Sequence, residues 1–120
     1  ADHTNRNRRQ LHVGDSRARF TETLAGRARC LVAHPVNPPH LVPLVEIVGG
    51  AKTSEATIER ASQFYAGLGK QAIRLRKEVP GHVANRLQAA LAREVYHLVA
   101  EDVVSVTDVD KALSWGPGLR

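Results

Sequence analysis

The runs Cys30-Leu31-Val32-Ala33-His34-Pro35 and Leu44-Val45-Glu46-Ile47-Val48 decide the fold expected for this chain. The first opens with four apolar residues, which is typical of a buried parallel strand. The second predicts another strand, closed by Gly49-Gly50. The segment between them cannot be helical and is expected to form an extended, well-defined loop, because it is rich in proline: Pro35, Pro38, Pro39 and Pro43.

Downstream of these runs, hydrophobic periodicity predicts one more strand and three helices. The expected elements are a helix from Thr53 or Ser54 to Leu68, a strand over 71–76, and helices over 82–102 and 105–115, the last with capping-box spacing between Thr107 and Asp110. This order predicts the end of an α/β domain, joined near residues 77–81 to an all-α domain. Three strands make a thin sheet, so we expect the sequence to be a fragment.

Composition limits the classes of protein that fit. Cys30 is the only cysteine, which excludes an intrachain disulfide and a thiolate metal cluster and fits a reducing compartment. No apolar run approaches the roughly 20 residues that span a bilayer, so a soluble cytoplasmic protein is expected. The net charge of +5 is concentrated in residues 1–30, which hold seven arginines against three acids. Residues 1–19 are expected to be irregular, either a solvated tail or a basic arm that binds nucleic acid.

Two residues are candidates for proton transfer. His34 lies where a predicted strand passes into the proline loop, and Glu46 lies inside the next apolar strand. Each alone has a structural explanation, as a surface residue or a member of an ion pair. Together they can form a hydrogen bond that orients the imidazole and stabilises its protonated form, as base catalysis requires. A metal site made with His40 is not expected, because the proline loop gives no regular ligand spacing.

Two motifs carry a resemblance to a known family. His34-Pro35-Val36-Asn37-Pro38-Pro39, with Pro43 to Val48, resembles the His-x-x-Asn-Pro…Leu-Val-Glu signature of the 3-hydroxyacyl-CoA dehydrogenase family. Val79-Pro80-Gly81-His82-Val83-Ala84-Asn85-Arg86-Leu87 resembles that family's Gly-x-x-x-Asn-Arg start of the C-terminal helical domain. The resemblance extends from Cys30 to Arg120. Within the family, the proline-rich motif is similar to members that act on small polar substrates such as gulonate or carnitine.

The resemblance implies a role for each candidate residue. His34 would be the general base for alcohol oxidation, with Glu46 as its orienting partner. Asn85 would hydrogen-bond the substrate oxygen, and Asn37 would shape the site beside the nicotinamide. The implied reaction oxidises the 3-hydroxyl of an acyl-CoA or a small 3-hydroxy acid by hydride transfer to NAD.

The resemblance also implies a domain organisation. Residues 20–78 would be the C-terminal part of a Rossmann-type NAD-binding domain, and residues 79–120 the first helices of a domain that forms a homodimer. The sequence has no Gly-x-Gly-x-x-Gly turn, so its cofactor-binding residues stay unknown. The alternative is a non-catalytic dimerisation or structural module derived from the same fold. No membrane partner is expected.

The family's Ser-Ser-Thr-Ser-Gly-like loop, expected upstream of the histidine, is missing from residues 1–18. Our hypothesis is that this segment is a frameshift product. Gln10-Leu11-His12-Val13-Gly14 can be encoded by DNA that reads Ser-Ser-Thr-Ser-Gly when shifted by one base. On this hypothesis the arginines are an accident of reading frame, and no nucleic-acid partner is expected. The encoding DNA decides it.

Overall fold

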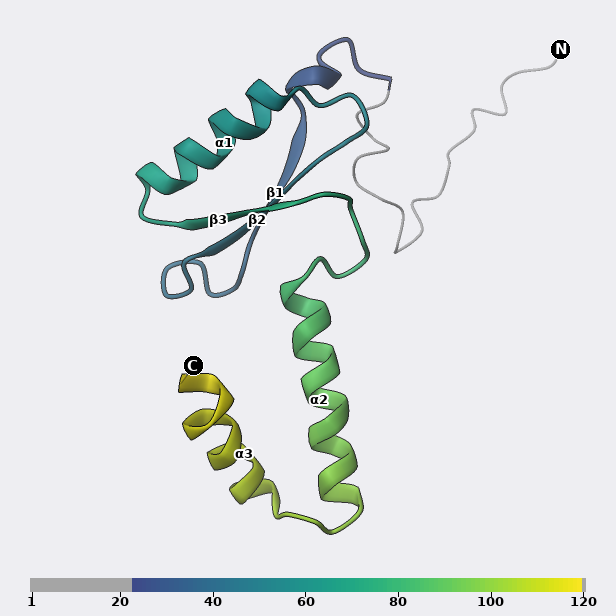
Figure 1. Cartoon of the computed structure of the whole chain (residues 1–120), viewed down its shortest axis with the longest axis vertical. Coiled ribbons are helices and arrows are strands. Elements are labelled where there is room, and N and C mark those ends of the chain that lie inside the picture. The colour runs from purple at the N-terminus through teal and green to yellow at the C-terminus, as the bar shows by residue number, and fades with distance from the viewer. Residues whose placement is uncertain (1–22, 120) are drawn as a thin grey trace, which may run out of the picture. The chain divides into compact units, whose positions relative to one another are not determined.

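The computed structural model describes residues 23–119 (Figure 1). Its contacts divide the chain into two compact units, Ala1–Pro80 and Gly81–Arg120. The predictions made for residues 1–19, including the frameshift hypothesis, lie outside the described residues.

The first unit contains a three-stranded sheet in the order β1-β2-β3. A short 3-10 helix (Arg27–Arg29) precedes β1 (Leu31–Pro35), and β2 (Leu44–Gly49) and β3 (Gln71–Leu75) follow. The prediction of a buried parallel strand for the first apolar run was wrong. β1 is half-buried and runs antiparallel to β2, whereas β2 and β3 are parallel. The short loop explains the difference, because a short connection joins antiparallel neighbours and a parallel pair needs a longer crossover.

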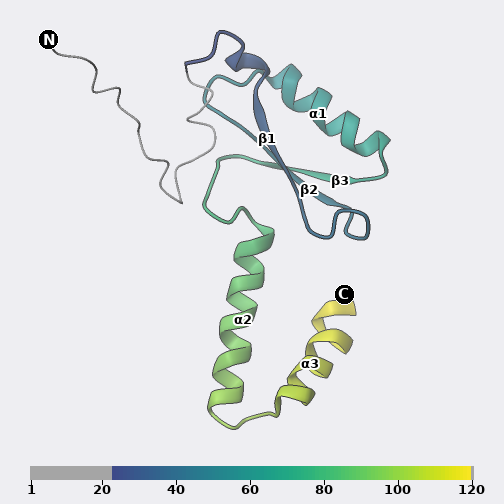
Figure 2. The ribbon, with the colours of Figure 1, turned by 180° about the vertical axis from the view of Figure 1, so that it is seen from behind.

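Helix α1 (Glu55–Gly67) supplies that crossover between β2 and β3 and covers one face of the sheet (Figures 1 and 2). Ile58 of α1 packs there against Val45 and Ile47, which are 1% and 0% exposed. Because side chains alternate along a strand, Glu46 and Val48 point to the opposite face. Complete burial of a Val or Ile side chain contributes about 1.5–3 kcal/mol, so this small cluster fixes the register of β2.

Side-chain capping fixes where α1 begins. Ser54, one of the two predicted caps, is the N-cap, and its hydroxyl accepts a hydrogen bond from the backbone N–H of Thr57. Thr53 instead donates from Oγ1 to the carbonyl of Cys30 and accepts from the N–H of Gly50. The Ser54 hydroxyl therefore caps the helix, and the Thr53 hydroxyl links the turn before the helix to the residue that precedes β1.

The end of α1 is a Schellman turn. Gly69 has φ +75° and donates its N–H to the carbonyl of Ala66, while the N–H of Lys70 reaches the carbonyl of Tyr65. Glycine adopts this left-handed conformation without the steric cost that a side chain adds. The turn sets the direction in which the chain leaves the helix and enters β3.

An exposed ion pair joins the start of α1 to β3. Arg74 donates from both guanidinium nitrogens to the two carboxylate oxygens of Glu55, at 2.6 and 2.7 Å. These hydrogen bonds, with the charge of Arg74, lower the pKa of Glu55 from its ordinary value, and Glu55 in turn raises the pKa of Arg74. Both side chains are open to solvent, so the pair contributes little to stability.

The second unit contains α2 (Ala84–Ala100), α3 (Val106–Trp115) and a short 3-10 helix (Pro117–Leu119). α2 begins later than the predicted His82, because His82 has a left-handed backbone with φ +51° and cannot start a helix. The predicted capping box of Thr107 and Asp110 was also wrong. Ser105 is the N-cap of α3 and accepts from the N–H of Asp108. In the part of the chain that the structure describes, no helix has the length and apolar character to cross a membrane.

Candidate active site

His34 and Glu46 form the most distinctive polar pair of the sheet. They lie directly opposite one another in the antiparallel β1–β2 register. His34 Nδ1 lies 2.9 Å from Glu46 Oε2, within hydrogen-bond distance. The spacing of twelve residues between them follows from the hairpin, because each side chain is near the loop end of its strand. The predicted contact therefore forms across the antiparallel register of β1 and β2.

The two side chains differ sharply in exposure. Glu46 is 0% exposed, whereas the His34 side chain is 28% exposed. A buried carboxylate is costly unless it is paired, and the imidazole supplies part of that pairing. The face opposite α1 therefore holds a buried carboxyl group that is hydrogen-bonded to a partly exposed histidine.

This geometry selects one form of the imidazole. When Glu46 is ionised, its carboxylate only accepts hydrogen bonds, so the proton between the two side chains then belongs to Nδ1 of His34. In the neutral ring, Nε2 is then the nitrogen without a proton. Protonation at Nε2 makes an imidazolium that the carboxylate stabilises. The pair can therefore accept a proton from a hydroxyl group and return it, which is general acid–base chemistry.

Asn37 lies in the loop Val36–Pro43, which connects the two strands of the pair. It is exposed and precedes a cis peptide bond to Pro38. Hydrogen bonds hold the loop at both ends. The N–H of Val36 donates to Leu44, and the N–H groups of Leu41 and Val42 both donate to the carbonyl of Pro38. Asn37 is thus presented at the same end of the sheet as His34.

The remaining predicted residues are Asn85, as a site residue, and His40, as a metal ligand. Asn85 is the second residue of α2 and belongs to the other unit. His40 is exposed in the loop, and the described residues hold no cluster of ligating side chains that includes it. The set of His34, His40 and Glu46 is therefore not brought together as a metal site.

Lys70 contacts this loop, and that contact was not predicted from the sequence. Its ammonium donates to the carbonyls of Pro39 and Val42, on the loop that follows His34. No sequence pattern indicates this contact, because Lys70 reaches across 31 and 28 residues to its two partners. Only the turn at the end of α1 brings the ammonium to the loop.

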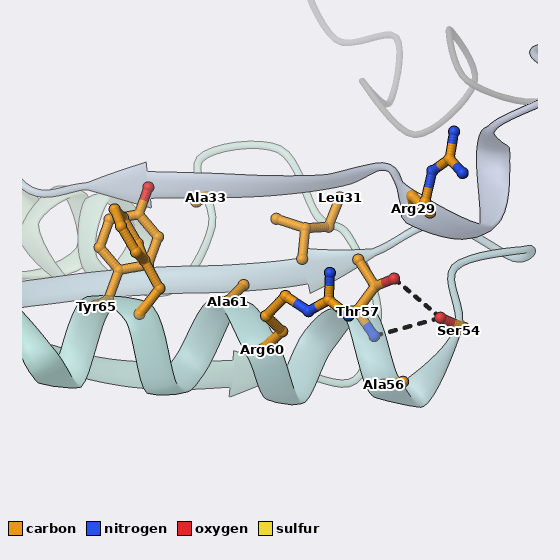
Figure 3. Close-up of a pocket in the computed structure, with 10 residues that line it drawn as sticks. Arg29, Leu31, Ala33, Ser54, Ala56, Thr57, Arg60, Ala61 and Tyr65 are labelled. Carbon is orange, nitrogen blue, oxygen red and sulfur yellow. Dashed lines mark hydrogen bonds between the residues drawn. The ribbon is translucent and has the colours of Figure 1, made fainter.

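A groove of about 520 Å³ lies on the other side of the sheet (Figure 3). Leu31 and Ala33 of β1 line it together with Ala61 and Tyr65 of α1, and the remaining lining residues are Arg29, Ser54, Ala56, Thr57, Arg60 and Phe64. The lining contains no histidine and no carboxylate, so it offers no ordinary general base. The His34–Glu46 pair lies on the opposite face of the sheet from this groove.

Both units match one protein family. Residues 16–79 match the family model described as 3-hydroxyacyl-CoA dehydrogenase, NAD binding domain. Residues 81–120 match the model described as 3-hydroxyacyl-CoA dehydrogenase, C-terminal domain. The two matches follow one another along the chain and change at the boundary between its two compact units.

Curated relatives agree with this match. The chain is 50% identical over 96 residues to L-carnitine dehydrogenase of Streptomyces griseus subsp. griseus, covering 80% of this chain and 29% of that protein. It is 51% identical over 92 residues to 3-hydroxyacyl-CoA dehydrogenase of Gibberella moniliformis, covering 77% of this chain and 29% of that protein. The chain thus spans less than a third of the length of these relatives.

Solved structures give the same result. FHMPC 5-dehydrogenase, described as an NAD+-dependent dismutase, superposes with a TM-score of 0.75 at 32% identity, over 85% of this chain and 33% of its own. (S)-3-hydroxybutyryl-CoA dehydrogenase PaaH1 of Ralstonia eutropha gives a TM-score of 0.73 at 25% identity, over 88% of this chain and 37% of its own. Family models, relatives and structures agree, and the chain belongs to the 3-hydroxyacyl-CoA dehydrogenase family.

Proposed function

We propose that this chain supplies the proton-transfer part of an NAD-dependent dehydrogenase that oxidises a 3-hydroxy group. The observation that carries the proposal is the hydrogen bond between His34 Nδ1 and the buried carboxylate of Glu46. It provides a base of fixed orientation, backed by a charge that solvent does not reach. Membership of a family whose N-terminal domain is described as NAD-binding supports the redox partner.

In the proposed reaction, the substrate hydroxyl gives its proton to His34 Nε2 while carbon 3 loses a hydride and becomes a carbonyl carbon. NAD, when bound, accepts that hydride. Glu46 keeps the imidazole oriented and stabilises the imidazolium that forms. In the reverse direction the same imidazolium returns its proton to the developing alkoxide. His34 thus acts as the base in one direction and the acid in the other.

The remaining parts of the site rest on the resemblance. It assigns Asn37 to the wall beside the nicotinamide and Asn85 to a hydrogen bond with the substrate oxygen, and both roles stay predictions. The sequence has no Gly-x-Gly-x-x-Gly turn, so no residue of this chain is proposed to hold the phosphates of the dinucleotide. We propose that residues 20–78 are the C-terminal part of the NAD-binding domain and residues 79–120 the start of the helical domain.

The names of the relatives support one substrate class for this proposal. Proteins about half identical to this chain are named both as L-carnitine dehydrogenases and as a 3-hydroxyacyl-CoA dehydrogenase. L-Carnitine is a small 3-hydroxy acid, and a 3-hydroxyacyl-CoA carries the same hydroxyl on a thioester. We therefore propose oxidation of a 3-hydroxyl that is β to a carboxylate or a thioester.

The test uses an extended protein, in which this chain replaces the matching residues of the Streptomyces griseus L-carnitine dehydrogenase. Formation of NADH is followed at 340 nm with L-carnitine and with (S)-3-hydroxybutyryl-CoA as substrates. We expect NAD-dependent oxidation of at least one of them. An extended protein that is folded by circular dichroism and binds NADH, but oxidises neither substrate, contradicts the proposal and favours a non-catalytic module of the same fold.

We also propose that the protein forms a homodimer through its helical unit. Several large apolar side chains of this unit are exposed, among them Leu87, Tyr96 and Trp115 at 67%, 72% and 75%. Exposed apolar patches of this kind are typical of surfaces that bind a partner. Sedimentation equilibrium of the extended protein is expected to give twice the mass of one chain. The mass of a single chain would contradict a dimer.

A further inference from the structure

The loop Val36–Pro43 receives several hydrogen bonds from the start of β3. The ammonium of Lys70 donates to the carbonyl of Pro39 and, at 3.4 Å, to the carbonyl of Val42. The next backbone N–H, that of Gln71, donates to the carbonyl of Pro43 at 2.9 Å. An ammonium has three donors and no acceptor, so it suits a cluster of backbone carbonyls.

These bonds matter because the loop has few donors of its own. Proline has no N–H, and the loop contains Pro38, Pro39 and Pro43. Its internal hydrogen bonds, from Leu41 and Val42, converge on the single carbonyl of Pro38. Lys70 supplies donors to two further carbonyls of the loop, and as a charged group it makes stronger hydrogen bonds than a neutral donor.

Lys70 is delivered to the loop by the end of α1. Gly69 has a left-handed backbone and turns the chain at this point. The backbone N–H of Lys70 still donates to the carbonyl of Tyr65 in the helix, while the side chain of Lys70 reaches the loop. The Lys70 side chain is half-buried there, so its bonds are less screened than those of a surface lysine. The backbone turn at Gly69 thus fixes where Lys70 lies, and the carbonyls of Pro39 and Val42 fix where its ammonium group lies.

We propose that Lys70 is a positioning residue of this site, which holds the loop carrying Asn37 in place beside His34. Lys70 does not touch the reacting atoms in this role and acts through the backbone of the loop. The inference rests on the proposed function, because the loop matters for catalysis only if His34 acts on a substrate there. It assigns a function to a lysine that lies outside the His–Glu pair.

The first test measures the loop directly by amide hydrogen exchange of the full chain, followed by NMR. In K70M we expect exchange of the Leu41 and Val42 amides to be about fivefold faster, because one net hydrogen bond is worth about 1 kcal/mol and 1.4 kcal/mol corresponds to a factor of ten. The core amide of Ile47 serves as the internal reference and is expected to keep its rate. K70R, which retains a charged donor, is expected to restore most of the loop protection.

The second test measures catalysis by the extended protein. We expect K70M to lower kcat for the 3-hydroxy substrate about tenfold, because a displaced site loses catalytic alignment, and to leave the KM for NAD unchanged. K70R is expected to recover most of that loss. The matched control is K52M, which removes the charge of an exposed lysine from the turn after β2 and is expected to leave both parameters unchanged.

The outcomes separate the two proposals. Unchanged loop exchange in K70M, or faster exchange with unchanged kcat, overturns the role of Lys70. An equal loss of kcat in K52M overturns it as well, because the effect would then belong to any lost charge. Absence of turnover by the unmutated extended protein contradicts the proposed function instead, and the exchange data still decide whether Lys70 holds the loop.

Discussion

Replacing His34 with Asn in the extended protein is expected to lower kcat by about 10²- to 10⁴-fold, the range that a positioned general base contributes. Asparagine is similar in size and retains a polar group facing Glu46, so the buried carboxylate keeps a hydrogen-bond donor. It cannot accept a proton near neutral pH, so the hydroxyl proton has no acceptor as the hydride leaves. The loss should therefore appear in turnover rather than in folding.

Binding and folding must be measured alongside the rate. NADH binding, followed by quenching of protein fluorescence, is expected to be unchanged in H34N, because the role proposed for His34 is proton transfer and not binding of the cofactor. H97N is the matched control, since His97 is an exposed histidine in the last turn of α2. It is expected to retain full activity. Turnover by H34N comparable to that of the unmutated protein would rule out His34 as the base.

The His–Glu pair was predictable because it combines two local signals. An acid in the middle of an apolar strand needs a partner, and a histidine at the end of the preceding strand is twelve residues away. The structure confirms that Glu46 is fully buried and hydrogen-bonded to His34. The α/β class followed by helices was also predictable from the spacing of apolar residues. Strand-like segments occur only before residue 77, and the segments after it have the helical period of 3.6 residues.

The direction of β1 and the role of Lys70 were not predictable from local pattern. An apolar run reads the same in either strand direction, and only the short connection to β2 decides the pairing. The contact of Lys70 with Pro39 depends on a left-handed turn at Gly69 and on where β3 joins the sheet. Such contacts arise from tertiary geometry, which composition and periodicity do not encode.

Replacing Glu46 with Gln in the extended protein is expected to lower kcat by a similar factor, about 10²- to 10⁴-fold, while the fold is retained. Glutamine has nearly the shape of glutamate, so the buried site keeps its packing. However, its amide nitrogen can donate to Nδ1 of His34. That hydrogen bond selects the ring form with its proton on Nε2, and in this form Nε2 has no lone pair left to accept the proton of the substrate hydroxyl.

The tautomer can be measured independently of the rate. Nitrogen-15 chemical shifts of the His34 ring are expected to show the proton on Nδ1 in the unmutated protein and on Nε2 in E46Q. E59Q is the matched control, because Glu59 is an exposed glutamate on α1 whose carboxylate accepts a hydrogen bond from Gln63 of the same helix. It is expected to keep both the shifts and the activity. A proton that stays on Nδ1 in E46Q, with turnover unchanged, would contradict the orienting role of Glu46.

The double variant H34N/E46Q shows whether Glu46 acts only by orienting His34 or also contacts the substrate or the cofactor itself. If Glu46 acts only through the imidazole, its loss costs nothing more once the imidazole is gone, and the double variant should be no slower than H34N alone. If the two losses instead multiply, Glu46 must contact the substrate or the cofactor itself. Because Glu46 is buried behind His34, with 0% exposure against 28%, we expect the first result.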